Sequence, residues 1–139
     1  MRFASFILIF LLITPAYAAD LTPVEIIAND KKVTFNVEIA DTYQKRILGL
    51  MHRTELADDE GILFIFPNEK IISMWMKDTL ISLDMIFIDG SGVIRDIAHN
   101  TTPESLDSIS SKVPCRYVLE IKAGMAKKHG IKLGNNIRF

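Results

Sequence analysis

The chain has 139 residues, of which 49% are hydrophobic and 24% charged, with a formal net charge of −1. This length suits one ordinary domain, and the near-neutral charge argues against nucleic acid, whose binding requires a basic surface. Cys115 is the only cysteine, so no internal disulfide can form and stability must come from the apolar core.

Residues 1–18 have the pattern of a secretory signal peptide. Arg2 is followed by the apolar run 6–13, and Ala16 and Ala18 occupy the small-residue positions before a cleavage site. The apolar run is too short for a spanning helix, which needs about 20 residues. We therefore expect cleavage to leave a single domain, residues 19–139, that is periplasmic or secreted and has no stable membrane anchor.

Residues 24–40 predict a β-hairpin with its turn at Asn29 and Asp30. Apolar residues occupy positions 33, 35, 37 and 39 and alternate with polar ones, which is typical of a half-buried strand.

A short amphipathic helix is predicted from Thr42 to about Met51. Asp41 would be the N-cap, with Gln44 completing a capping box. The spacing of Tyr43, Ile47 and Leu50 would place these three side chains on one apolar face.

The rest of the chain predicts short strands separated by turns. Turn signals at 89–92 and a long polar loop over 100–114 separate them, and 123–129 predicts a second short helix. We expect a mainly β fold, either a β-sandwich or a partly open barrel, with two short helices. The predicted strands are 62–66, 72–77, 83–88, 93–98, 116–122 and 135–139.

Four segments resemble the family known as domain of unknown function 192. They are "GLMHR" (49–53), "GILFIF" (61–66), "WMKDTLISLDMIFID" (75–89) and "YVLEIKAG" (117–124). The resemblance covers nearly all of the chain after residue 18, and it implies a compact, mainly β fold without an established activity. Asp78 departs from the pattern, where the family is expected to have Asn.

A candidate recognition surface comprises Trp75, Lys77, Asp84 and Glu120. On a strand, Met74 and Met76 would face the core while Trp75 and Lys77 face the opposite side. A hairpin loop would return Asp84 beside Lys77, and Glu120 would join them if its strand is adjacent. The competing interpretation is a structural tryptophan surrounded by ion pairs.

The function expected from this cluster is a non-catalytic binding or accessory module. Its ligand would be a small molecule, carbohydrate-like because Trp75 can stack on sugars, or a protein partner; Arg53 is an additional candidate. The alternative is a hydrolase using Asp84 and Glu120 as a carboxylate pair.

No cofactor or metal is expected. The three histidines match no ligand spacing, and the two methionines at 74 and 76 are better explained by packing than by Cu(I) binding. Cys115, between Pro114 and a predicted strand, is expected to be a buried thiol rather than a nucleophile.

Overall fold

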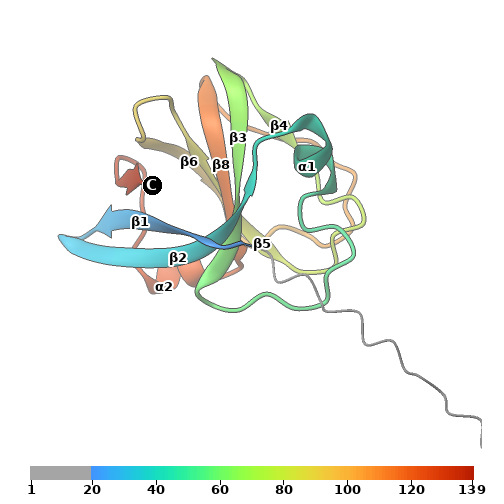
Figure 1. The fold of residues 1–139 in the computed structure, drawn as a ribbon, viewed down its shortest axis with the longest axis horizontal. Coiled ribbons are helices and arrows are strands. Elements are labelled where there is room, and N and C mark those ends of the chain that lie inside the picture. Colours follow the sequence, from blue (N-terminus) through green and yellow to red (C-terminus); the bar gives the residue numbers. More distant parts are fainter. Residues whose placement is uncertain (1–19) are drawn as a thin grey trace, which may run out of the picture.

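A computed structural model describes residues 20–139, in which nine strands and two short helices form a mainly β fold. Seven of the strands make one sheet that curls into a half-barrel (Figure 1). Of the two predicted architectures, the partly open barrel is therefore the one observed. The predicted signal peptide lies outside the described residues. Within residues 20–139, no helix is long and apolar enough to cross a membrane.

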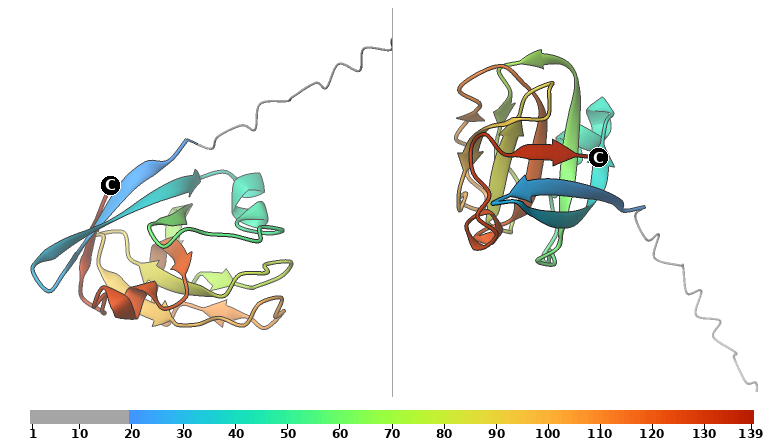
Figure 2. Two further views of the ribbon diagram at one scale, coloured as in Figure 1. Left: turned by 90° about the horizontal axis from the view of Figure 1, so that it is seen from below. Right: turned by 90° about the vertical axis from the view of Figure 1, so that its left-hand side faces the viewer.

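The seven-stranded sheet has the order β6-β5-β8-β3-β2-β1-β9, and β4 pairs with β7 in a separate two-stranded sheet. Helix α1 and the tip of the β1–β2 hairpin lie at opposite ends of the molecule (Figure 2). The elements are β1 (Thr22–Ala28), β2 (Lys31–Ala40), α1 (Tyr43–Leu48), β3 (Glu60–Lys70), β4 (Ser73–Met74), β5 (Leu83–Ile88), β6 (Ile94–Ala98), β7 (Ile109–Ser110), β8 (Cys115–Lys122), α2 (Met125–Lys128) and β9 (Asn136–Arg138).

The predicted hairpin is confirmed. Ala28 pairs with Lys31, which leaves a two-residue turn at Asn29 and Asp30. Both residues have positive φ, 50° and 58°, as a type I′ turn requires, and Asn and Asp tolerate this region better than other side chains that carry a Cβ.

The curled sheet closes partly on itself through the C-terminal segment. β9 pairs with β1, and Val93 forms an isolated bridge with Asn136. The Ile94 N–H donates to the Asn135 carbonyl at 2.9 Å, and the Ile137 N–H donates to Gly92 at 2.8 Å. These bonds satisfy backbone groups that an open edge would expose to solvent.

Both faces of the central strands are covered, which the sequence pattern does not predict. One core lies inside the half-barrel and includes Phe35, Leu63 and Leu119. A second core on the opposite face includes Phe64 and Phe87, together with Met76 from the segment after β4. The predicted burial of Met76 is confirmed, whereas Met74 is only half-buried.

The first helix is shorter than predicted, and its cap differs. Thr42 is the N-cap, and its hydroxyl accepts from the Lys45 N–H at 3.2 Å. Asp41 instead pairs with the Lys45 ammonium at 3.6 Å. The helix ends at Gly49, whose φ of 46° breaks the helical conformation. None of its six residues is buried.

Cys115 is fully buried at the start of β8, as expected. Burial is also the main reason that its thiol pKa is raised, so little thiolate is present at neutral pH. A thiol reagent should therefore label native protein far more slowly than denatured protein, and Cys115→Ala should cost about 1 kcal/mol of stability. Mass spectrometry of labelled samples measures the rate ratio; equal rates in the two states would contradict this burial.

Candidate functional site

A groove runs along α1, between the helix and the segment that contains β4. Its outer part is a cavity of about 280 Å³, and a much smaller inner cavity adjoins it. The two cavities share Arg46, Ile47, Phe64, Met74 and Trp75, so we treat them as one site, the α1 groove. Tyr43, Phe66, Pro67, Lys70 and Ser73 line only the outer part, while Leu48, Gly49, Leu50, Met51, Lys77, Thr79 and Glu120 line only the inner part.

The apolar residues of α1 face this groove and the solvent rather than the core. Tyr43 is 68% exposed, and Ile47 and Leu48 are each about half exposed. Of the predicted apolar stripe, only Leu50, which follows the helix, is buried. The helix is held in place by polar contacts: the Arg46 guanidinium donates to the Ile65 carbonyl at 2.8 Å.

Trp75 and Lys77 lie together, as predicted. Trp75 is 47% exposed, and the Lys77 ammonium lies 5.2 Å from the centre of its ring. This geometry allows a cation–π contact, which is weak at an exposed position. Trp75 forms a wall of the groove, and nearly half of its surface remains open to a ligand.

Glu120, which is predicted to share a recognition surface with Trp75 and Lys77, lies at the inner end of the groove and is buried. Its side chain is on the face of β8 that also carries Val118, and its strand neighbours are Ile62 and Met85. The residue is only 4% exposed, and burial raises its pKa to about 8. The close approach of β3 is possible because position 61 is glycine, where a Cβ would clash with the Glu120 carbonyl.

The Glu120 carboxyl has no hydrogen-bond or charge partner that shifts its pKa among the described residues. Buried carboxyl groups are usually paired or hydrogen-bonded. This one opens instead onto the inner cavity, together with Thr79 and Lys77. At neutral pH it is a protonated acid that can donate a hydrogen bond to a group in the groove.

Asp84 is not part of this surface. Its side chain is fully buried, and it accepts hydrogen bonds of 3.0 Å from three backbone N–H groups: those of Asn100, Gly124 and Ala126. It therefore fastens the turn before α2 and the loop after β6 to the start of β5. No ion pair between Asp84 and Lys77 is found within residues 20–139; the nearest basic group is His99 Nδ1 at 3.9 Å.

The carboxylate-pair alternative fails on geometry. Asp84 is opposite Ile121 in the sheet, whereas Glu120 is opposite Met85. Opposite residues share a face and neighbouring residues do not, so Asp84 and Glu120 point to different faces of the sheet. The two groups cannot act on one scissile bond.

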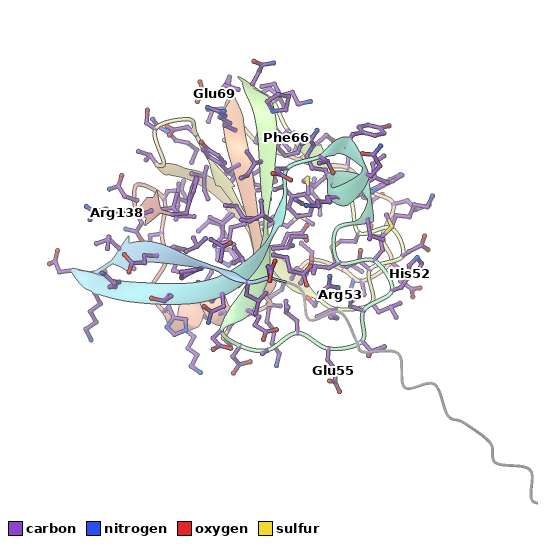
Figure 3. All side chains as sticks on the ribbon, in the orientation of Figure 1. His52, Arg53, Glu55, Phe66, Glu69 and Arg138 are labelled. Atoms are coloured by element: carbon purple, nitrogen blue, oxygen red, sulfur yellow. The ribbon has the colours of Figure 1, made fainter. Side chains whose placement is uncertain are left out.

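Arg53 is also separate from the groove, in the segment after α1 (Figure 3). Its guanidinium forms a two-bond pair with the Glu38 carboxylate, at 2.6 and 2.5 Å. This geometry makes Arg53 a structural tie between that segment and β2. In contrast to Arg53, Phe66, which lies near α1 in the same view, lines the outer part of the groove.

Asp78, where we expect the family pattern to have Asn, has a φ of 51°. Asn and Asp are the side chains that best tolerate this left-handed conformation, so either residue suits the turn. Its carbonyl accepts from the His52 N–H at 2.8 Å. Within residues 20–139, no group of three or more His, Cys, Asp or Glu side chains is placed to hold a metal ion.

The sequence pattern predicts Trp75, Lys77 and Glu120 as site residues but does not predict the apolar wall of the groove. Alternation places Met74 in the core, and no motif marks Phe66 or Lys70 as site residues. The exposed side of α1 could have been suspected from Leu48, which lies outside the apolar stripe of Tyr43, Ile47 and Leu50.

The DUF192 family model, described as "Uncharacterized ACR", matches residues 24–139. A comparison with curated proteins finds no match.

Two solved structures are similar over most of their length. A Novosphingobium aromaticivorans protein of unknown function has 32% identity and a TM-score of 0.85, over 91% of this chain and 90% of that one. A Sinorhizobium meliloti protein, whose description proposes a transcription-regulator role, has 36% identity and a TM-score of 0.84, over 88% of this chain and 96% of that one. Together with the family match over residues 24–139, these similarities show that the chain belongs to the DUF192 family.

Proposed function

We propose that this protein is a non-catalytic binding module and that the α1 groove is its ligand site. The observation that carries the proposal is the Glu120 carboxyl, which is buried, lines the inner part of the groove and has no hydrogen-bond partner among residues 20–139. Burial of such a group opposes folding once it ionises. A ligand that accepts a hydrogen bond from the Glu120 carboxyl would explain why an acid is buried at this position.

The shape and lining of the groove suit a small molecule. Its outer cavity of about 280 Å³ is close to the lower end of typical small-ligand sites. Phe64, Phe66, Met74 and Trp75 supply apolar walls. The polar side chains are Arg46, Lys70 and Ser73 in the outer part and Lys77, Thr79 and Glu120 in the inner part. This lining suits an apolar or aromatic ligand better than a sugar, although a sugar could also stack on Trp75.

A protein partner is the second candidate, and the exposed side of α1 favours it. Tyr43, Ile47 and Leu48 expose apolar surface next to the groove, and such surfaces mark interaction sites when they are contiguous. A protein partner would cover the exposed part of this helix, whereas a small molecule within the groove would leave most of that part in solvent.

Trp75→Ala tests the proposal. Because Trp75 is half exposed, the variant should remain folded, with a stability change below about 1 kcal/mol. The neutral fluorescent probe N-phenylnaphthylamine should bind the wild type, and the variant should bind it at least about fivefold more weakly, since stacking contributes on the order of 1 kcal/mol.

Leu133→Ala is the matched control, because Leu133 is apolar and exposed but outside the groove. It should leave probe binding unchanged. Equal binding to wild type and Trp75→Ala would reject the groove as the ligand site. Stable capture of a protein that Leu48→Ala abolishes, with no effect of Trp75→Ala on the probe, would favour the second candidate.

We also propose that the protein is exported. The basis is the signal-like pattern of residues 1–18. Intact mass spectrometry of the protein recovered from the exported fraction should give the mass of residues 19–139. A mass that still includes residues 1–18 would reject cleavage.

A further inference from the structure

We propose, building on the proposed function, that the α1 groove selects small molecules that join an apolar body to one anionic group. The inference rests on the distribution of charge around the groove. Three cationic side chains line it, from α1, from the end of β3 and from the segment after β4: Arg46, Lys70 and Lys77.

None of these three cations has a carboxylate partner within residues 20–139. The Lys70 ammonium and the Arg46 guanidinium each lie 5.3 Å from the centre of the Phe66 ring, and Lys77 lies over Trp75. Lys45, on the same helix as Arg46, contrasts with them because it pairs with Asp41. The aromatic walls thus hold positive charge at the groove without neutralising it.

The only acidic side chain that lines the described groove is Glu120, and it does not offset this charge at neutral pH. The side chains around it are apolar on both neighbouring strands, Ile62 on β3 and Met85 on β5. Arg46 from α1 and Lys77 from the segment after β4 are the charged groups that line the same cavity. The groove is therefore cationic although the whole chain has a net charge of −1.

An anionic group complements this arrangement in two ways. Lys77 can donate a charge-assisted hydrogen bond to it in the inner part of the groove, where the protonated Glu120 carboxyl can donate another. Lys70 adds positive potential from the outer part. A cationic ligand would meet the three cations and a neutral acid, so it lacks a complementary charge. The apolar body would lie along Phe64, Met74 and Trp75.

Two probes with one ring system test the inference. Anilinonaphthalene sulfonate carries an anionic group, and N-phenylnaphthylamine lacks it. At pH 7 the wild type should bind the sulfonate at least about fivefold more tightly. Relative to the neutral probe, Lys77→Met should weaken the sulfonate about three- to tenfold, and Lys70→Met should weaken it by a smaller factor. Lys45→Met is the matched control and should affect neither.

The pH dependence gives a second readout. Sulfonate affinity should fall as pH rises through about 8, because Glu120 then ionises and repels the anion. Glu120→Gln keeps a donor and should remove this fall. Equal affinity for both probes, with each weakened by Trp75→Ala, would overturn the anion inference and leave the proposed function standing. Binding of both probes that is insensitive to Trp75→Ala would overturn both.

Discussion

Glu120→Gln is expected to stabilise the folded protein at pH 8 by about 4–5 kcal/mol relative to the wild type. Burial raises the pKa of Glu120 from 4.5 to about 8 in the folded state. Between these values the folded state holds a proton that the unfolded state has released, so wild-type stability falls as pH rises. Each pKa unit corresponds to about 1.4 kcal/mol. Glutamine has a similar shape and does not titrate.

The measurement is chemical denaturation of both proteins from pH 4 to pH 9. The difference between them should be near zero at pH 4, grow through the neutral range and level off above about pH 8, where the folded wild type has also lost the proton. Glu55→Gln is the control, because it removes the same charge from the exposed loop after α1. A difference that stays flat across the range would show that Glu120 is not a buried, protonated acid.

Asp84→Ala should have the opposite effect, a loss of about 3–5 kcal/mol at pH 7. The substitution leaves three backbone N–H groups without their carboxylate acceptor, those of Asn100, Gly124 and Ala126. Hydrogen bonds to a charged group are worth about 1.5–3 kcal/mol each, and unmade buried donors are costly. Urea denaturation measures the loss.

The matched control is Asp107→Ala, in an exposed position of the loop before β7, which should change stability by less than about 0.5 kcal/mol. A loss below about 1 kcal/mol for Asp84→Ala would contradict the fastening role. Probe binding adds a separate check, because Asp84 faces away from the groove and its folded variant should bind as the wild type does.

The local elements could be predicted because their causes are local. The alternation over 33–39 and the turn at Asn29 and Asp30 each depend only on residues that are neighbours in the sequence. The register of β1 and β2 follows from these two features. Strand β5 was predicted with its observed bounds for the same reason: a short apolar run between turn residues.

The groove could be predicted only in part, because its form depends on residues far apart in the sequence. Alternation correctly separated Glu120 from Leu119, but it could not show that a second core covers the Glu120 face. That cover comes from Met76 and the segment around β4, whose position is set by pairing with β7. The sequence does not reveal the role of Asp84 for a related reason. Its three hydrogen-bond partners are backbone N–H groups, whose positions carry no sequence signal.

The pairing of β9 with β1 has a consequence for how the protein is made. Strand β9 ends at Arg138, next to the last residue of the chain, and it also contacts the turn before β6. β1 and β9 lie at opposite ends of the described residues, so during synthesis β1 has β2 as its only strand partner until the segment that contains β9 has left the ribosome. Contacts between segments this far apart in the sequence form late and slowly, so the half-barrel closes after the other strands of the sheet have been made. A nascent chain halted before Ile137 should remain sensitive to protease.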